Sequence, residues 1–543
     1  MLQTSPILLI MLFALVLFCA PRFITSLLSF GGGNHDDALQ DLESLCALIA
    51  DIRQPHTTWS ASNLPSQWEG VEVYARNNWQ SSETVQSIAW NSQFLRGNMH
   101  FESLPARLEY LGMQDNFIHA TLDCAKIPRS LIAIHLQENR LHGSVDLTTL
   151  PPGLRILKLF QNNFKGSIDL SSLPVTLEEL YLRQNEFDSE IVLDALPAPL
   201  RELSLSMNAL TGSVDLEQLP DNLQLFFVYS NQFSGSVDLA HLPESLEKLQ
   251  LHCNSLCGSL DLRNFPQGLQ EIHLQLNLFT GSLDLSRLNP ALVSLKLQEN
   301  ALSGVVDLSR LPPRLAELYL RQNAFSGGIH LSALPESLTQ LSLSSNLFEN
   351  ELNLTALPDA LRELYVYRNR FHGSVDLTNL PRALEVAKLY RNEMSGTICL
   401  TKLSPSLIEL HLQRNDFSGT IDLTALPATM RVLRLQENQL TGSVNMTALP
   451  EKMSEVLLRQ NKFSGSVNIA KLPQSLKRLS LASNSFSCSV SLSQLPESLE
   501  ELYLYGNDFH GTANVKGRLA RLKTLRCHDT GIIITGFDSV DKP

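Results

Sequence analysis

An asparagine recurs along this chain at a fixed interval of 23 residues. It occupies eighteen successive positions without a slip: Asn116, Asn139, Asn162, Asn185, Asn208, Asn231, Asn254, Asn277, Asn300, Asn323, Asn346, Asn369, Asn392, Asn415, Asn438, Asn461, Asn484 and Asn507. Gln93 and Thr530 continue the register at the two ends, so about twenty turns can be counted. A period of this length indicates a solenoid, in which each turn buries its apolar face only against its neighbours.

One turn, residues 311–331, reads LPPRLAELYLRQNAFSGGIHL. Its leucines alternate with polar residues as in a strand, so Leu318 and Leu320 should point inward and stacked turns should form one long parallel sheet. Asn323 should satisfy backbone groups where the chain leaves the strand, because its amide both donates and accepts. We expect Phe325 to fill the interior and Gly327 to adopt unusual dihedral angles. The (V/I)-x-L triplet that follows predicts a second short strand at the rear.

The phrase L-x-x-L-x-L-x-x-N identifies the turns as leucine-rich repeats. The longer phrase (V/I)-D-L-T-x-L-P-x-x-L looks most like the leucine-rich-repeat proteins of kinetoplastid protists, and L-P-x-x-L is shared with bacterial effectors. The resemblance covers roughly residues 85–535. It implies a right-handed solenoid (horseshoe), α/β by convention but strand-dominated, with a long parallel concave sheet and a second short-strand sheet. Such repeats serve many partners, so the fold alone does not name a function.

The chain divides into four predicted regions. Residues 1–30 contain an unbroken apolar run at 7–20, which suits a signal peptide, or a signal anchor if it is not cleaved. Residues 31–84 are predicted to be a linker and a helical N-terminal cap, with an amphipathic helix over 37–52. The solenoid should occupy residues 85–515, and residues 516–543 should form a C-terminal cap and tail.

All four tryptophans precede the regular turns, at Trp59, Trp68, Trp79 and Trp90. Together with Trp68-Glu69-Gly70-Val71, they make this segment similar to the N-terminal cap of plant-type leucine-rich-repeat receptors. In that family cysteines flank the W-x-G-V element, but Ser66 and Val73 stand there in this chain. The disulfide that the resemblance implies should therefore be absent.

No enzyme signature emerges from the sequence. The eight cysteines occupy different slots of the repeat and form no CxxC pair, so neither a disulfide framework nor a metal site is predicted. Cys527-His528-Asp529 superficially resembles the Cys-x-Asp of bacterial ubiquitin ligases. Those enzymes need a separate catalytic domain, however, and only fourteen residues follow Asp529 in this sequence. The net charge of −13 argues against nucleic acid as a partner. We expect no catalytic residue, no cofactor and no metal.

The outward slots of the predicted concave sheet carry the sharpest functional signal. The positions four and two before each asparagine contain no Asp or Glu. The candidate ligand-binding residues in these slots are Lys158, Lys296, Lys388, Arg434, Arg183, Arg321, Arg459, Tyr181, Tyr319, Tyr365, Tyr367, Tyr503, Tyr505, His273 and His411. Tyr and Arg dominate binding energy at interfaces, which favours a ligand face. The alternative is a merely solvated sheet, since Tyr favours strands; this explains the tyrosines but not the missing acids.

The rear of the predicted solenoid has a negative charge, opposite to that of the front slots. An aspartate recurs there, for example at Asp238, Asp261 and Asp284, and we interpret this column as a solvated acidic ridge. The two N-glycosylation sequons, at Asn353 and Asn445, occupy the same slot. If residues 1–30 direct secretion, glycans are expected at one or both sites, which would leave the concave face bare.

A longer period is superimposed on the repeat, because LYLRQN at 180–185 recurs at 318–323 and, as VLLRQN, at 456–461. Each step is 138 residues, or six turns, which indicates duplication of a six-turn block.

We therefore predict a non-catalytic protein that binds a protein, or an anionic or polar glycan, on its concave face. It would act at the cell surface, in an endomembrane lumen or after secretion, and would touch a membrane only through residues 1–30. The alternative is an intracellular, cytoplasmic interaction scaffold, which the missing cap disulfide favours.

Overall fold

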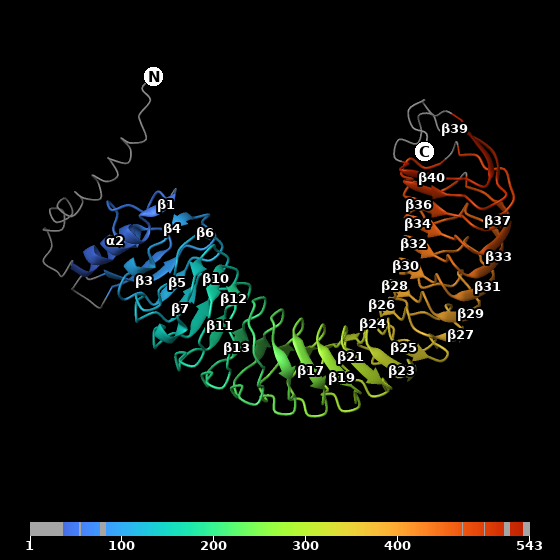
Figure 1. Ribbon diagram of the computed structural model, residues 1–543. Helices are drawn as coiled ribbons and strands as arrows, with labels where there is room; N and C mark the ends of the chain where they lie inside the picture. The colour runs from blue at the N-terminus through green and yellow to red at the C-terminus, as the bar shows by residue number, and fades with distance from the viewer. Residues whose placement is uncertain are drawn as a thin grey trace, which may run out of the picture. The chain divides into compact units, whose positions relative to one another are not determined.

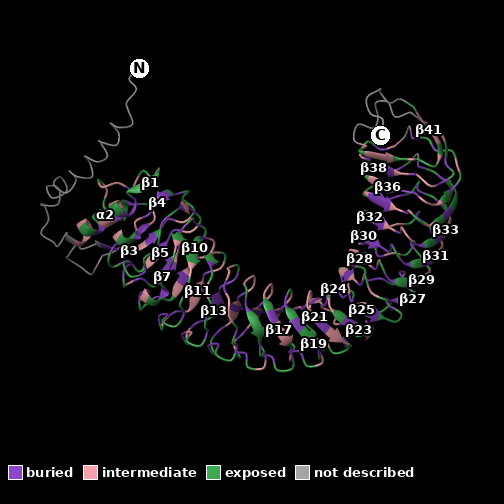
Figure 2. Cartoon of the chain, viewed as in Figure 1, coloured by how far each residue is buried: buried purple, intermediate pink, exposed green. Residues whose placement is uncertain are grey.

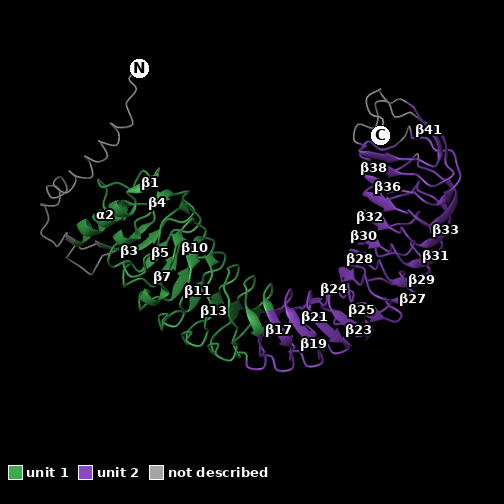
Figure 3. Ribbon diagram, viewed as in Figure 1, with its two compact units in different colours: residues 1–235, 242–255 green, residues 236–241, 256–543 purple. Residues whose placement is uncertain are grey.

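The structure is a computed structural model that describes residues 36–53, 56–75, 83–469, 471–492, 495–514 and 522–535. Its chain is a strand-dominated solenoid in which successive turns stack side by side (Figure 1). Two compact units are distinguished (Figure 3): unit 1 comprises residues 1–235 and 242–255, and unit 2 comprises residues 236–241 and 256–543. The signal segment predicted at residues 1–30 lies outside the described residues, as do residues 516–521 and 536–543 of the predicted C-terminal cap and tail.

Each unit has a front sheet of short strands, one per turn. In unit 1 these are β2 (Val71–Ala75), β3 (Glu83–Ala89), β5 (Tyr110–Gly112), β7 (Ala133–His135), β9 (Ile156–Lys158), β11 (Glu179–Tyr181), β13 (Glu202–Ser204), β14 (Leu225–Phe227) and β16 (Lys248–Gln250). In unit 2 they are β18 (Glu271–His273), β20 (Ser294–Lys296), β22 (Glu317–Tyr319), β24 (Gln340–Ser342), β26 (Glu363–Tyr365), β28 (Val386–Lys388), β30 (Glu409–His411), β32 (Val432–Arg434), β34 (Glu455–Leu457), β36 (Arg478–Ser480), β38 (Glu501–Tyr503) and β40 (Thr524–Arg526).

The register of the front sheet repeats the register of the sequence. Leu318 of β22 pairs in parallel with Leu341 of β24, which is the residue 23 positions later. The first pair differs, because β2 runs antiparallel to β3. The long parallel sheet predicted from the leucine pattern is therefore present within each unit.

A second set of short strands lies at the rear of the turns. Its members are β1 (Asp51–Arg53), β4 (Arg96–Asn98), β6 (Phe117–Ile118), β8 (His142–Gly143), β10 (Asn163–Gly166), β12 (Glu186–Phe187), β15 (Ser234–Ser236), β17 (Ser255–Ser259), β19 (Leu278–Gly281), β21 (Ala301–Gly304), β23 (Ala324–Gly328), β25 (Leu347–Glu349), β27 (His372–Ser374), β29 (Glu393–Thr397), β31 (Asp416–Thr420), β33 (Gln439–Val444), β35 (Lys462–Val467), β37 (Ser485–Phe486), β39 (His510–Asn514) and β41 (Gly531–Thr535).

The second strand was predicted at the wrong place in the turn. It covers the N-x-F-x-G segment rather than the (V/I)-x-L triplet, and within the described residues only β33, β35 and β39 reach the first position of the triplet. Ile329 and Leu331 of the triplet are instead anchored by burial, at 5% and 2% exposure. The alternation of the triplet was correct, but its partner is the apolar interior and not a hydrogen-bonded neighbour.

The N-terminal segment packs on the first turns. Helix α2 (Asp36–Leu48) contacts β3, whereas the predicted helix ran to residue 52; Ile52 lies in β1, which pairs antiparallel with β4. Three short 3-10 turns follow in unit 1: η1 (Pro65–Gln67), η2 (Phe101–Ser103) and η3 (Leu147–Thr149). No helix within the described residues is long and apolar enough to span a membrane.

Three of the four tryptophans form one cluster, and Trp79 lies outside the described residues. The ring centroids of Trp59 and Trp90 are 4.1 Å apart, and those of Trp59 and Trp68 are 6.3 Å apart. The indole N–H groups of Trp59 and Trp90 both donate to the backbone oxygen of Glu69, at 3.0 and 2.9 Å. The cysteines of the described residues are all free thiols, so no disulfide supports this cluster there.

The asparagine column makes the hydrogen bonds that its amide chemistry predicts. The Nδ2 of Asn323 donates to the oxygen of Leu320 in its own turn at 3.1 Å and to that of Leu297 in the preceding turn at 3.0 Å. Its Oδ1 accepts from the backbone N–H of Leu302 at 3.0 Å. Each asparagine thus ties two turns together and satisfies buried backbone groups that would otherwise cost about 1–3 kcal/mol each.

The residue before each asparagine has a left-handed backbone, which the sequence analysis did not predict. From Asp115 to Ser483 these residues have φ between +53° and +60°, although none is glycine. The conformation lets the backbone N–H of the residue reach the next turn, as when Gln322 donates to the oxygen of Ser344 at 2.8 Å. No β-branched residue stands in this column, as expected where φ is positive.

The core lies between the front and rear strands, where Figure 2 shows buried positions recurring along every turn. Leu315, Leu318 and Leu320 are fully buried, and Phe325 stacks on Phe348 with ring centroids 6.3 Å apart. Gly327 has φ +78°, which confirms the expected turn. The outward slots of the front sheet are thus positioned by a rigid, repeating scaffold.

Candidate functional site

The predicted ligand-binding residues lie on the outer side of the front sheet. In β22 the central Leu318 is buried, while Glu317 and Tyr319 on either side are half-exposed. The slot four before the asparagine is the last residue of each three-residue front strand, and the slot two before it follows the strand. The glutamates six before the asparagine therefore share this outer side with the basic residues.

These glutamates pair with the basic residues of neighbouring turns. The Nζ of Lys158 lies 2.7 Å from Glu179, that of Lys296 lies 2.8 Å from Glu317, and that of Lys388 lies 3.1 Å from Glu409. Arg434 pairs in the same way with Glu455. Adjacent strands are only about 4.8 Å apart, so a long basic side chain reaches the next turn easily. The acid-free slots are consequently lined by acids that reduce their net charge.

Three arginines that share one slot of the duplicated block have three different environments. Arg183 stacks over the ring of Phe160, with its guanidinium carbon 4.3 Å from the centroid. Arg321 pairs with Glu299, whereas Arg459 pairs with Glu437 at 3.0 Å. The turn that precedes each arginine decides its contacts.

The tyrosines of the face are held by hydrogen bonds or by stacking. The hydroxyl of Tyr365 donates to Glu363 at 2.7 Å and that of Tyr503 to Glu501 at 3.2 Å, while Tyr181 donates to Glu202 and Tyr319 to Gln340. Burial, with Glu317 and Glu363 nearby, raises the pKa of Tyr319 to about 12. Tyr367 stacks on Tyr390 at 4.4 Å, and Tyr505 stacks on His528 at 4.7 Å.

The two predicted histidines are anchored within the face. His273 lies 3.2 Å from the hydroxyl of Ser294. His411 is buried, with its Nε2 3.2 Å from Glu409. Burial, followed by the charges of Arg434 and Lys388, lowers the pKa of His411 to about 4. His411 is therefore neutral at pH 7 and adds no charge to the face.

One hollow on the front of unit 2 is rich in basic side chains, and we call it the cationic hollow. Its volume is about 440 Å³, and it is lined by Arg368, Lys388, Tyr390, Arg391, His411, Gln413, Arg414, Arg434, Gln436, Glu437 and Arg459. Six of these residues are cationic at neutral pH and one is a carboxylate. A neighbouring hollow of about 350 Å³ shares Gln436 and Arg459 and continues to Tyr503, Tyr505 and Arg526.

The structure brings together four predicted residues in the cationic hollow, namely Lys388, His411, Arg434 and Arg459. It also adds Arg368, Arg391 and Arg414, which the sequence analysis missed. All three stand in the left-handed position before the asparagine, with φ of +55°, +56° and +58°. The absence of β-branched residues from that column was the signal that could have identified a constrained, exposed position beside the face.

The rear aspartates have a structural role beyond their charge. Each carboxylate accepts from the backbone N–H two residues on, as Asp146 does from Thr148 at 3.0 Å and Asp422 from Thr424 at 2.8 Å. In the sequons, Asn353 and Asn445 make the same bond to Thr355 and Thr447, at 2.9 and 3.0 Å. Both asparagines are exposed. The slot therefore needs an acceptor, which either Asp or Asn supplies.

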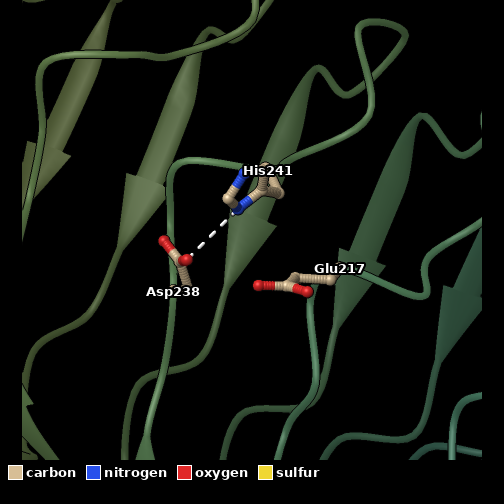
Figure 4. Close-up of side chains that lie close together, drawn as sticks. All are labelled: Glu217, Asp238 and His241. Carbon is tan, nitrogen blue, oxygen red and sulfur yellow. Dashed lines mark hydrogen bonds and ion pairs between the residues drawn. The ribbon is translucent and has the colours of Figure 1, made fainter.

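An exposed histidine joins this rear column at one place. The Nδ1 of His241 lies 3.1 Å from the carboxylate of Asp238, as Figure 4 shows. Glu217, drawn in the same view, belongs to the other unit. Asp238 and His241 alone are an ordinary surface ion pair, and we assign no metal site to them.

No protein-family model and no curated protein matches the chain. Solved structures do. The Arabidopsis receptor kinase HAESA, in complex with the peptide hormone IDA and the co-receptor SERK1, is 25% identical with a TM-score of 0.65, over 91% of this chain and 90% of that chain. YopM from Yersinia enterocolitica is 25% identical with a TM-score of 0.62, over 97% and 98% of the two chains. PEPR1 bound to AtPEP1 is 23% identical with a TM-score of 0.67, over 91% and 75%.

These neighbours are leucine-rich-repeat proteins, and their similarity covers most of the solenoid. The chain has the leucine-rich-repeat fold.

Proposed function

We propose that the protein is a non-catalytic recognition protein that binds a protein or peptide partner through its front sheet. The observation that carries the proposal is the gathering of basic and aromatic side chains on the front of unit 2 in a chain of net charge −13. Structural neighbours crystallised with a peptide hormone support the same mode of use. Arg and Tyr are the side chains that contribute most at interfaces.

The proposal is tested with peptides selected from a displayed random library on the full-length protein. Their affinities are then measured for a front variant, Arg183→Gln/Arg321→Gln/Arg459→Gln, and for a rear variant, Asp238→Asn/Asp261→Asn/Asp284→Asn. The rear variant keeps the acceptor that each turn needs, so its fold should be intact. We expect the front variant to weaken binding about tenfold or more, and the affinity of the wild type to fall with salt.

Unchanged binding by the front variant, together with loss in the rear variant, would contradict the proposal and assign recognition to the acidic ridge. If the library yields no peptide and the protein instead binds sulfated glycans on an array tightly, the partner class would be a glycan and not a peptide.

We further propose that the protein acts at the cell surface, in a lumen or after secretion. The exposure of Asn353 and Asn445, each in a complete sequon, supports this location. Expression in the source cells should yield a protein whose mass falls on deglycosylation and whose Asn353→Gln/Asn445→Gln variant does not shift. A wild-type mass unchanged by deglycosylation, in a protein that external protease reaches only after the plasma membrane is opened, would support the cytoplasmic scaffold.

A further inference from the structure

The cationic hollow differs from the rest of the front sheet because part of its charge has no internal partner. Arg414 and Arg459 share Glu437, at 2.7 and 3.0 Å. Lys388 pairs with Glu409 at 3.1 Å, and Arg434 pairs with Glu455. Within the part of the chain that the structure describes, Arg368 and Arg391 have no carboxylate at ion-pair distance. Two guanidinium groups on adjacent turns are thus exposed and uncompensated.

Their position makes these two arginines a built feature of the fold. Both hold the left-handed conformation that costs an ordinary residue on the order of 1 kcal/mol, and their backbone N–H groups donate to Tyr390 and Gln413, at 2.9 and 3.0 Å. The turn spacing therefore holds the two side chains about 4.8 Å apart at their origins. Beside them lies the stacked pair of Tyr367 and Tyr390.

Unsatisfied acceptors lie in the same hollow. The Oε1 atoms of Gln413 and Gln436 are buried without a hydrogen-bond partner, and Gln413 is only 8% exposed. A buried acceptor without a partner costs about 1–3 kcal/mol, and because both oxygens are inaccessible from the surface they are part of the scaffold rather than contacts for a ligand. The arginines, in contrast, offer paired N–H groups that match the two oxygens of a carboxylate or phosphate.

We propose that the cationic hollow binds an acidic segment of the partner protein, whose carboxylate or phosphate oxygens meet Arg368 and Arg391. The inference rests on the proposed function and narrows it to one place and one chemistry. An acidic peptide fits this site because its side-chain anions match the paired N–H groups of the two guanidinium groups. A volume of about 440 Å³ accommodates a few side chains of such a segment.

The duplicated block provides an internal comparison for this assignment. The residues that line the hollow have equivalents two 138-residue steps earlier, and there Ser92, Asp115 and Glu138 replace Arg368, Arg391 and Arg414. The glutamine is retained, since Gln137 also has a buried Oε1 without a partner. The amide acceptors therefore belong to the common scaffold, whereas the uncompensated arginines are particular to this hollow.

The test uses the full-length protein and four fluorescent probes: an eight-residue peptide of alternating Asp and Ser, its Asn counterpart, a form with phosphoserine and Asn, and a heparin-derived oligosaccharide. Affinities are measured by fluorescence anisotropy for the wild type, for Arg368→Gln/Arg391→Gln and for a control, Arg310→Gln/Arg314→Gln. The control removes two exposed arginines of the same unit that do not line the hollow. Thermal unfolding verifies that both variants fold.

We expect the wild type and the control to bind an acidic peptide, and the Arg368→Gln/Arg391→Gln variant to bind it about tenfold more weakly, since charged hydrogen bonds are the stronger class. The affinities of the Asp peptide and the phosphoserine peptide tell which oxyanion is preferred. The uncharged Asn peptide should bind neither the wild type nor either variant. Equal loss in the control, or no loss in the hollow variant, would overturn the proposal. Arginine-dependent binding of the oligosaccharide alone would overturn it in favour of a sulfated glycan.

Failure here is distinguishable from failure of the proposed function. Library peptides that lose affinity for Arg183→Gln/Arg321→Gln, neither of which lines the hollow, but not for Arg368→Gln/Arg391→Gln would keep the front sheet as the recognition face and reject the hollow. Self-association of the wild type that the same double variant abolishes, without peptide binding, would assign the hollow to the acidic rear of a second copy instead.

Discussion

Two equivalent stretches of the front face, residues 92–183 in unit 1 and residues 368–459 in unit 2, share a scaffold but not a charge. Both have the asparagine column, the left-handed residue before it and a buried glutamine, at Gln137 and Gln413. At the eleven positions that line the cationic hollow, unit 2 has six cations and one carboxylate, whereas the unit 1 equivalents have two of each. A hollow in unit 1 is accordingly lined by Asp115 and Glu138.

The comparison shows how a repeat protein changes its surface without changing its fold. Residues in the inward slots are fixed by packing, and the asparagine is fixed by its hydrogen bonds. The outward slots and the residue before the asparagine are free to vary, provided that the latter is not β-branched. The charge of the surface can therefore diverge between duplicated blocks while the stabilising contacts stay common to both.

The largest expected effect tests the common part. Asn162→Ala in unit 1 and Asn438→Ala in unit 2 remove equivalent bonds, to the oxygens of Leu136 and Leu159 at 3.0 Å each and of Leu412 and Leu435 at 3.1 and 3.0 Å. Each substitution should destabilise its turns by about 3–5 kcal/mol, because several buried backbone groups lose their partners. Hydrogen exchange should show opening that is local to the substituted turns and of similar size in the two units. Clearly unequal effects would show that the blocks do not share one scaffold.

The next effect concerns acid stability, through His411 and its equivalent His135. The pKa of His411 is lowered to about 4, chiefly by burial, with Arg434 and Lys388 adding to the effect and Glu409 opposing it. The pKa of His135 is also lowered, by burial and Lys158, against Glu179. Because the folded protein binds the His411 proton more weakly than the unfolded chain, stability is complete above pH 6.5 and is lost as pH falls from 6.5 towards 4.

His411→Asn should therefore reduce the loss of stability between pH 7 and pH 5, by up to about 2 kcal/mol. His135→Asn should do the same in unit 1 to a smaller degree. Urea unfolding at the two pH values measures both. A pH dependence that neither variant alters would place the acid sensitivity on other groups.

Transferring the arginines of unit 2 to unit 1 tests whether they are sufficient to create the site. Ser92→Arg/Asp115→Arg/Glu138→Arg gives unit 1 the arginines of unit 2. The backbone should tolerate the change, because the equivalent arginines of unit 2 have the same positive φ. We expect a second site for the acidic peptide, with stoichiometry rising from one to two and an affinity in unit 1 about tenfold above that of the native sequence. Isothermal titration calorimetry measures both quantities. A graft that folds but binds one peptide would mean that the surrounding turns, and not the arginines, define the hollow.

The smallest effect is expected at the rear. Asp146→Asn in unit 1 and Asp422→Asn in unit 2 keep the acceptor for the N–H of Thr148 and of Thr424, so stability should change by less than about 0.5 kcal/mol in either unit. The alanine variants should each lose about 1 kcal/mol, because the acceptor is gone. Equal losses for Asn and Ala, measured by thermal unfolding, would show that the charge matters at this slot and the hydrogen bond does not.

The sequence by itself determined the period, the parallel front sheet, the inward leucines and the role of the asparagine. These follow from local rules: strand alternation fixes which side chains are buried, and an amide at that bend can both donate to backbone oxygens and accept from a backbone N–H. It also identified the slots that face outward. It misplaced the second strand, because an alternating triplet is equally compatible with burial and with a hydrogen-bonded ladder.

Only the tertiary structure decided which charges remain available. Lys158, Lys388 and Arg434 stand in acid-free slots, yet each is matched by a glutamate one turn away, since stacking brings residues 21 positions apart within ion-pair distance. Arg368 and Arg391 stand outside those slots, and the left-handed backbone before the asparagine places them beside the face. Charge pairing in a solenoid depends on neighbours across turns, and no single turn contains that information.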